Sequence, residues 1–341
     1  MPRCVIYTCA YNAENTLERT VNSILSQTHR DWIWYLVDNG STDRTGKLIK
    51  KYAGKDKRIV PLANKENHVW VDGNSWWEVS SRIPGCDYFS FLDADDEYAP
   101  DFLEKMLAFI EENNLDIAAC GNVRIVEETG EQIDGFMTKK NLILNEGNYS
   151  RFFHEYIQFM YTTWGKLYKV SVLHSMDMLR YPLIFYGWDT MFAIEAFRNA
   201  ERIGILADSL HRYYLSEKTV THRYDNTRTI STWLSIDAFE GFLLEKTGHI
   251  SQKNREVLSN IYFNNIGRAL MNIIDVQVPI GQKLTDICDI LTHQRTGDLA
   301  QWQEHFKERQ EFITKVMNWV LNHSEVQSHE RFIFLTKVNR V

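Results

Sequence analysis

Three carboxylates crowd one short segment of the sequence, because Asp93, Asp95 and Asp96 directly follow the apolar run Tyr88–Leu92. If this run is a buried strand of a parallel sheet, the carboxylates lie at its carboxyl end, where open α/β sheets bind ligands. Hard divalent cations such as Mg²⁺ or Mn²⁺ take oxygen ligands and often share them with substrate phosphates. The motif therefore suits a metal that bridges the protein to a diphosphate. The plainer interpretation is a solvated acidic turn that caps a helix expected at Pro100.

The first hundred residues alternate strand-like and helix-like segments. The runs expected to form strands are Cys4–Thr8, Trp32–Val37, Ile59–Leu62 and Tyr88–Leu92. The segments expected to form helices are 17–27, 41–52 with Ser41 as its cap, 73–81, and one that begins at Pro100. This alternation predicts an α/β fold, with a largely parallel sheet and covering helices.

The rest of the chain divides into a mixed part and a helical part. Strands are expected at Ile117–Cys120 and Val123–Val126, and helices at Tyr149–Phe159 and from Trp188 onward. Helical periodicity then recurs over 233–245, 254–274, 280–291 and 299–322. We therefore expect one domain over 1–225, with halves of about 1–115 and 116–225, followed by a helical C-terminal region over 226–341.

Composition excludes several classes of protein. The 44% hydrophobic and 24% charged residues are typical of a globular protein with a core. The net charge of −7 gives no whole-surface attraction for nucleic acid, so none is expected as a partner. Five dispersed cysteines without a CxxC pair indicate a reducing compartment. The sequence has no apolar run of about 18 residues and no signal peptide before its first strand, so we expect a cytoplasmic protein.

Several segments together resemble one enzyme family. Tyr7–Asn12, Ser26–Thr28, Val37–Asp43 and Phe91–Asp96 match, in order and spacing, the N-terminal half of inverting family 2 glycosyltransferases of bacterial type. Trp164–Tyr168 looks like the acceptor-side W-x-K-L-Y stretch of that family, and Gly187–Asp189 stands where the family usually carries an E-D pair. The resemblance covers roughly residues 1 to 220. It implies the GT-A fold, a Rossmann-like mixed and mostly parallel sheet with covering helices.

The resemblance also implies an activity. A nucleotide-diphosphate sugar would give up its sugar, of hexosyltransferase type, to an acceptor hydroxyl with inversion and with help from Mn²⁺ or Mg²⁺. Asp95 would ligate the metal that bridges the two phosphates, and Asp93 would approach the ribose or the metal. Asp189 would be the general base, a role that contributes about 10²- to 10⁴-fold to the rate. Asp189 is also a good helix N-cap, and the two roles can hold together.

Further donor-side roles follow from the same resemblance. Cys9 and Tyr11 would line the nucleobase pocket, and Asp38 with Asn39 would meet the base edge. The remaining positions implied on the donor side are Ala94 of the D-A-D motif, Asp72, Asn74 and Lys218, with His222 as a further metal ligand. The stretch from Leu210 to Arg223 falls where the family often has a mobile loop over the donor phosphates.

Three positions depart from the family pattern. Asn39 replaces an aspartate that accepts the N3–H of uracil, and its amide both accepts and donates, which weakens the case for a uridine donor. Asp72 stands in place of an arginine, beside the aromatic residues Trp70, Trp76 and Trp77. Trp188 replaces the glutamate of the E-D pair, so Asp189 alone would serve as base.

Two alternatives remain to be weighed. A nucleotidyltransferase is disfavoured, because Ala10–Asn15 lacks the glycines and basic residues that cradle a triphosphate. A degenerate transferase that binds a nucleotide or glycan without catalysis stays open, since two motifs are altered.

Acceptor and partners are expectations only. The acceptor would be a glycan, a lipid-linked molecule or a protein, in polysaccharide biosynthesis. An apolar stripe on the last helix would pack on its own domain or on a second copy, giving a homodimer; it comprises Phe306, Phe312, Ile313, Val316, Met317, Trp319 and Val320. Peripheral contact with the inner membrane face is a hypothesis that follows from the lipid-linked acceptors common in the family.

Overall fold

The computed structural model describes residues 4–67, 75–81, 85–182, 187–216, 227–275 and 278–300, and the single residues Glu311, Thr314, Asn318 and Asn322. The chain forms two compact units. Unit 1 comprises Met1–Pro182 and Asp189–Thr219, and unit 2 comprises Leu183–Trp188 and Val220–Val341. The acidic cluster Asp93, Asp95 and Asp96 belongs to unit 1.

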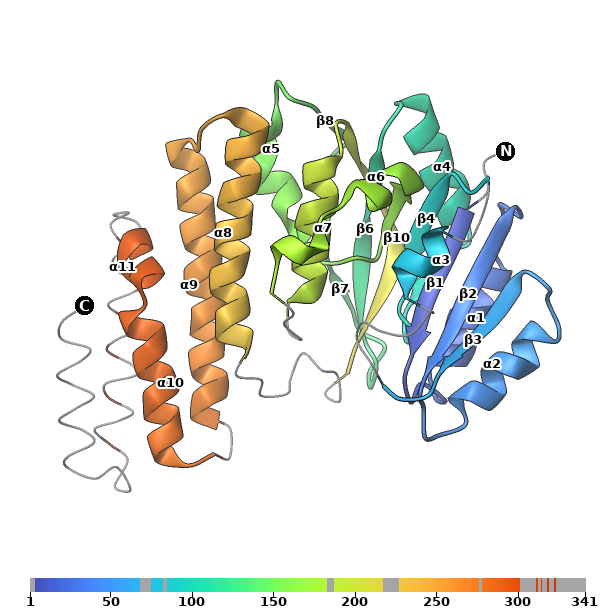
Figure 1. The fold of residues 1–341 in the computed structure, drawn as a ribbon, viewed down its shortest axis with the longest axis horizontal. Coiled ribbons are helices and arrows are strands. Elements are labelled where there is room, and N and C mark those ends of the chain that lie inside the picture. Colours follow the sequence, from blue (N-terminus) through green and yellow to red (C-terminus); the bar gives the residue numbers. More distant parts are fainter. Residues whose placement is uncertain are drawn as a thin grey trace. The chain divides into compact units, whose positions relative to one another are not determined.

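Unit 1 is built on one mixed sheet (Figure 1). Six strands run in the same direction: β1 (Cys4–Ala10), β2 (Trp32–Asn39), β3 (Ile59–Asn64), β4 (Tyr88–Phe91), β6 (Ile117–Val126) and β10 (Ile203–Leu215). Four strands oppose them: β5 (Glu97–Tyr98), β7 (Gln132–Asp134), β8 (Leu142–Leu144) and β9 (Lys166–Lys169). The order is β3-β2-β1-β4-β9-β6-β10-β5, with β7 on β6 and β8 on β10. The predicted mixed α/β sheet is confirmed.

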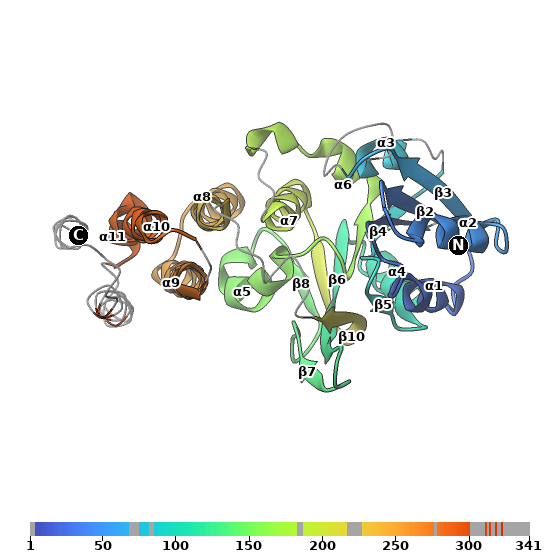
Figure 2. The same ribbon diagram turned by 90° about the horizontal axis from the view of Figure 1, so that it is seen from below.

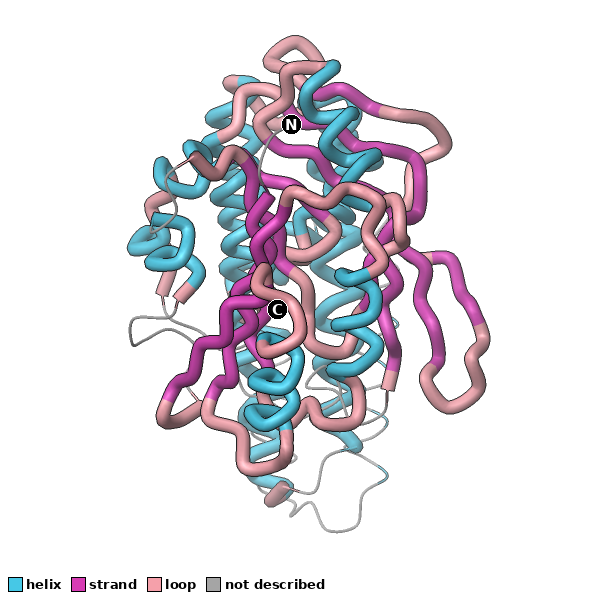
Figure 3. Tube along the Cα trace, turned by 90° about the vertical axis from the view of Figure 1, so that its right-hand side faces the viewer, coloured by secondary structure: helices cyan, strands magenta, loops and turns pink. Residues whose placement is uncertain are grey.

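Helices cover both faces of this sheet. Those of unit 1 are α1 (Leu17–Leu25), α2 (Thr45–Ala53), α3 (Trp76–Ser81), α4 (Phe102–Glu112), α5 (Tyr149–Tyr156), α6 (Val170–Ser175) and α7 (Trp188–Asn199, whose first residue belongs to unit 2). Two 3₁₀ turns, η1 (Ile157–Met160) and η2 (Met178–Arg180), complete the helical segments of this unit. Figure 2 shows α1 and α4 on one face and α3 and α6 on the other, and in Figure 3 strands (magenta) run between helices (cyan). Because both faces are covered, the central strands are mostly apolar, although β6 and β9 carry the buried polar residues Asn122 and Lys166.

Aromatic side chains fill the layer between β4 and α7. Phe192 of α7 packs on Phe91 with ring centroids 5.1 Å apart, on Trp76 at 4.9 Å and on Tyr168 at 5.8 Å. Trp76 is therefore a packing residue, whereas Trp77 remains 43% exposed. This contact fixes the start of α7 over the carboxyl end of β4.

Several element boundaries differ from the sequence-based expectations. The helix expected from Ser41 begins at Thr45, because Ser41 Oγ accepts a hydrogen bond from the backbone N–H of Asn12 in the neighbouring loop (3.0 Å). The two strands expected over 117–126 form one strand, β6, that carries a buried Asn122. The helix expected to reach Phe159 gives way to the 3₁₀ turn η1 after Tyr156.

The stretch Leu210–Tyr214 was expected in a mobile loop, and this expectation is wrong. These residues belong to β10, which pairs in parallel with β6 over most of its length. Backbone hydrogen bonds to β6 and the burial of His211 outweigh the polar composition of the stretch.

Unit 2 is helical where it is described. Its helices are α8 (Thr227–Thr247), α9 (Gln252–Asp275), α10 (Ile280–Thr292) and α11 (Gln294–Ala300). Trp233 stacks on His293 with ring centroids 3.7 Å apart, and Arg295 pairs with Glu240 at 2.8 Å. These contacts hold α8 against the turn between α10 and α11.

Two expectations about membranes and partners depend on the end of the chain. Within the described part, none of the helices combines the length and apolar character that a membrane span requires. The apolar stripe from Phe306 to Val320 lies outside the described residues. The expected helix over 299–322 is described only at its first two residues, in α11, and at four single helical positions.

Candidate functional site

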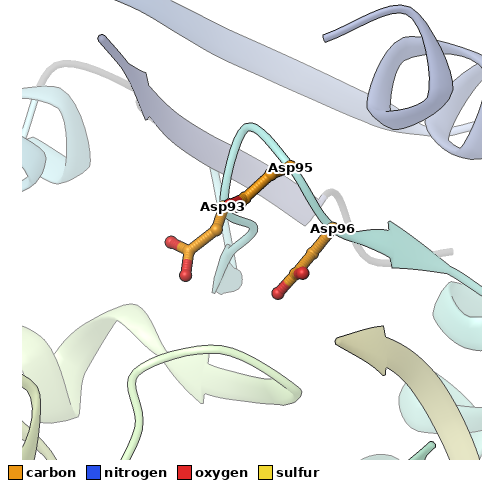
Figure 4. Close-up of side chains that lie close together, drawn as sticks. All are labelled: Asp93, Asp95 and Asp96. Carbon is orange, nitrogen blue, oxygen red and sulfur yellow. The ribbon is translucent and has the colours of Figure 1, made fainter. Parts of the chain in front are cut away.

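The acidic cluster lies in the turn between β4 and β5 (Figure 4). One carboxylate oxygen from each of Asp93, Asp95 and Asp96 lies within 4.8 Å of the other two. The turn continues the path of β4, since the N–H of Leu92 still donates to Tyr7 O of β1 (3.1 Å). A buried strand therefore delivers three carboxylates to the carboxyl edge of the sheet.

Crowding changes the acidity of the cluster. Asp93 keeps an exposed surface, yet the surrounding protein removes enough hydration to raise its pKa, and the charges of Asp96, Asp95 and Asp189 raise it further. Burial likewise raises the pKa of Asp95, against the opposing charge of Arg19. A group of like charges with reduced hydration gains from a nearby cation.

Asp96 is not the helix cap that the plainer interpretation required. It is completely buried; its Oδ2 lies 2.9 Å from His211 Nε2, and its Oδ1 accepts the N–H of Tyr214 at 3.0 Å. Burial lowers the pKa of His211 to about 3, so the imidazole is neutral and donates to Asp96. The His211 ring in turn stacks on Trp164, with centroids 4.2 Å apart. Asp96 therefore fastens the acidic turn to β10.

Two side chains at the start of α1, Thr16 and Arg19, bind the backbone of the same turn. Thr16, just before α1, donates its hydroxyl to Ala94 O at 3.0 Å, and Arg19 Nε donates to Asp95 O at 2.8 Å. The Arg19 guanidinium also lies 3.7 Å above the Tyr214 ring and pairs with Glu127 at 2.7 Å. Sequence reasoning missed Arg19 and His211, whose partners are far away in the chain.

Asp189 lies in the first turn of α7. It stands three residues before Phe192, so both side chains share the helix face that packs over β4 and β9. Asp189 keeps an exposed surface, but loss of hydration raises its pKa to about 6 while the charge of Lys166 opposes that rise. Asp189 also raises the pKa of Asp93 through its charge, so the two carboxylates lie near each other.

The candidate donor-side residues of β1 and β2 lie at the same edge. Cys9 and Tyr11 keep exposed surfaces at the end of β1. Reduced hydration around the Cys9 thiol and the charges of Asp93 and Asp38 raise the pKa of Cys9 to about 11. Asp38 Oδ1 accepts the N–H of Ser41 at 3.0 Å. Cys9, Asp38 and Asp93 are thus brought together by three adjacent parallel strands.

Asn39 lies in a row of side-chain amides. It is buried, its Oδ1 accepts from Asn64 Nδ2 at 2.8 Å, and its Nδ2 donates to Asn67 Oδ1 at 2.9 Å. Its amide is therefore engaged with β3 and the residues that follow β3. The expected hydrogen bond between Asn39 and the edge of the nucleobase would therefore compete with these two amide contacts.

Four candidate residues lie outside the described part of the chain: Asp72, Asn74, Lys218 and His222.

Comparisons with known proteins identify the family of this chain and agree with its fold. Residues 5–173 match the family described as "Glycosyl transferase family 2". An uncharacterized glycosyltransferase of Haemophilus influenzae is 30% identical over 185 residues, 54% of this chain and 68% of that protein. The uncharacterized glycosyltransferase EpsJ of Bacillus subtilis is 24% identical over 65% of this chain. This chain spans 63% of the EpsJ length, less than two thirds.

A solved structure supports the fold. S. aureus TarS 1–349, in complex with UDP-GlcNAc, superposes with a TM-score of 0.64 at 17% identity, over 90% of this chain and 92% of that one. The sheet order, the acidic turn and these matches define one class of protein, a glycosyltransferase with the GT-A fold. The chain belongs to glycosyltransferase family 2.

Proposed function

We propose that this chain transfers a sugar from a nucleoside diphosphate sugar to an acceptor hydroxyl, with inversion at the anomeric carbon. The observation that supports the proposal is the acidic turn, in which Asp93 and Asp95 follow β4 at one edge of the sheet and the charge of Asp189, at the start of α7, acts on Asp93. Carboxylates on the turn after β4 suit a metal–diphosphate site. A carboxylate on a separate helix suits a base on the other side of the sugar.

The acidic turn fits a divalent cation. Its oxygen ligands are those that Mg²⁺ and Mn²⁺ prefer. The pKa values of Asp93 and Asp95 are raised by lost hydration and, at Asp93, by the neighbouring carboxylates, and a cation would offset both effects. Asp95 and Asp93 would hold the ion, which would supply charge neutralisation for the leaving diphosphate. Thr16 and Arg19 keep the turn in place by binding its carbonyl oxygens.

Asp189 would accept the proton of the acceptor hydroxyl. Inversion requires attack from the face opposite the leaving group, so the base and the diphosphate site must be on different elements. The pKa of about 6 leaves Asp189 mostly ionised at neutral pH, yet more basic than an ordinary aspartate. Trp188, the preceding residue, would contribute an apolar wall for the acceptor.

The proposal also covers the pocket for the nucleobase of the donor. Cys9, Tyr11 and Asp38 would line its pocket, and the row of Asn64, Asn39 and Asn67 would form the floor beside it. UDP-GlcNAc is the first donor to test, because TarS has been solved with it and shares this fold. Acceptor identity, membrane contact and dimer formation remain predictions from the sequence.

A thermal-shift screen tests the proposal directly. UDP-, GDP-, CMP- and dTDP-sugars would be added with Mn²⁺ or with excess EDTA. A ligand that binds only the folded chain at a hundred times its Kd raises its free energy of unfolding by about 2.7 kcal/mol. We expect one nucleotide class to stabilise the chain only with metal, and donor turnover with that class. Binding without any turnover would favour the non-catalytic nucleotide-binding alternative, and equal shifts in EDTA would contradict the metal site.

Arg19 gives a prediction about the turn itself. Arg19→Met removes the donor to Asp95 O, so we expect the apparent affinity for Mn²⁺ to fall about 10-fold or more, as for other residues that orient metal ligands. The matched control is Arg58→Met, since Arg58 also pairs with a carboxylate (Asp56, 2.6 Å) and lies 3.7 Å over an aromatic ring (Trp32). The same apparent Mn²⁺ affinity for both variants would show that Arg19 does not support the metal site.

A further inference from the structure

Lys166 is a buried lysine beside the proposed base. Its side chain is only 1% exposed, although lysines are almost never fully buried unless paired. It is the first residue of β9, which runs antiparallel between β4 and β6. Lys166 therefore lies beside the carboxyl end of β4, the strand that leads into the acidic turn, and pairs with Ala119 of β6 on its other side.

The ammonium of Lys166 has a complete set of acceptors. Its Nζ donates to Thr162 O at 2.7 Å, to Thr162 Oγ1 at 3.0 Å and to Trp164 O at 3.0 Å. Only the protonated amine has three N–H groups, so this geometry favours the charged form. None of the three acceptors is a carboxylate. The positive charge is thus held in place by the segment Thr162–Trp164 without a direct ion pair.

Asp189 is the carboxylate that this charge acts on most clearly. Burial lowers the pKa of Lys166 to about 7, and Cys120 and Asp189 oppose the fall. In return Lys166 lowers the pKa of Asp189. The other ionisable groups coupled to Asp189 are Tyr168, next to Lys166 on β9, and Asp93 of the acidic turn. Lys166 is the cation in this set.

We infer that Lys166 is a positioning residue for sugar transfer: its ammonium form orders the segment Thr162–Trp164 and places a positive charge near Asp189. The two segments are in contact, because Thr190, the residue after Asp189, donates its hydroxyl to Tyr161 O at 3.4 Å. The inference rests on the proposed function. The positive charge favours the ionised form of Asp189, the form that can accept a proton, and the ordered segment Thr162–Trp164 keeps one geometry beside it. Misplacing catalytic groups by about 1 Å can cost about 100-fold in rate. As a positioning residue, Lys166 would act through Asp189 and the segment Thr162–Trp164, without contacting donor or metal.

The experiment compares neutral and charged replacements. Lys166→Gln keeps two N–H donors without the charge, Lys166→Met removes both, and Lys166→Arg keeps a charge. We expect kcat for sugar transfer to fall about 10- to 100-fold in the neutral variants, with the donor KM changed by less than about threefold. The arginine variant should recover part of kcat. Should Lys166→Met fail to fold, Lys166→Gln carries the test.

Two controls separate this role from general damage. Lys169→Gln alters the other lysine of β9, which pairs with Asp116 at 3.1 Å, and should keep kcat. In an Asp189→Asn background, Lys166→Gln should cost no more than about twofold further, because both changes impair the same step. An undiminished loss in that background, or wild-type kcat in Lys166→Gln, overturns the inference. Wild-type protein that transfers no sugar from any donor overturns the proposed function instead, and this inference with it.

Discussion

Asp189→Asn is expected to lower the rate of sugar transfer by about 10²- to 10⁴-fold, the range for loss of a general base. The amide is close in shape to the carboxylate but cannot accept the acceptor proton. Donor affinity, measured by thermal shift with Mn²⁺, should change by less than about twofold, because a general base acts in the transition state and contributes little to binding of the donor. Asp208→Asn is the control and should keep the wild-type rate, since Asp208 lies on β10 and its carboxylate pairs with Lys105 of α4 at 2.7 Å.

The pH dependence of the wild-type rate supplies a second readout for Asp189. A base works only when unprotonated, and its pKa is raised to about 6. The rate should therefore be sustained at neutral pH and decline as the pH falls through about 6. Asp189→Asn should lose this decline along with most of its activity. A variant that retains half the wild-type rate would show that another group takes the proton.

Asp95→Asn should abolish the stabilisation that donor and metal give together. The amide removes one anionic metal ligand, so the thermal shift seen with a donor and Mn²⁺ should disappear. The variant without ligands should unfold at the same or a higher temperature than wild type at neutral pH. This follows because the pKa of Asp95 is raised in the folded state, so its ionised form costs stability there.

The Asp95 prediction is specific because Asp95→Asn should lose the donor-dependent thermal shift without losing stability in the absence of ligands. Asp101→Asn is a suitable control, because its carboxylate pairs with Lys105 at 2.9 Å at the start of α4. It should leave the donor shift intact. A lower unfolding temperature for Asp95→Asn together with a retained donor shift would mean that Asp95 serves the fold and not a metal.

Local signals sufficed for the parts of the site that lie next to a buried strand. An apolar run followed at once by Asp93 and Asp95 predicts both the strand and the edge at which the acids emerge. Helical spacing from Trp188 likewise predicted α7 and the place of Asp189 in its first turn. In each case the chemistry-bearing residue is within a few positions of the pattern that locates it.

Contacts between distant segments could not be predicted in this way. Asp96 and His211 are 115 positions apart, and the antiparallel pairing of β5 with β10, in which His211 lies opposite Tyr98, brings them together. Residues 210–214 were expected in a loop because of their place in the family pattern, and their burial in β10 depends on neighbours that periodicity does not reveal. The burial of Lys166 was missed for the same reason, because it depends on the packing of β9 between β4 and β6, which are distant in the sequence.

The attachment of Asp96 has a consequence for the order in which ligands enter. Both Asp96 oxygens are already hydrogen-bonded to residues of β10. Asp93 and Asp95 are therefore the two carboxylates of the turn that remain to bind a cation. Mg²⁺ requires about six oxygens in an octahedral arrangement. Two protein ligands leave most of these positions to water and phosphate. The empty chain should therefore retain the ion poorly, and the cation should arrive with, or be trapped by, the nucleotide it accompanies.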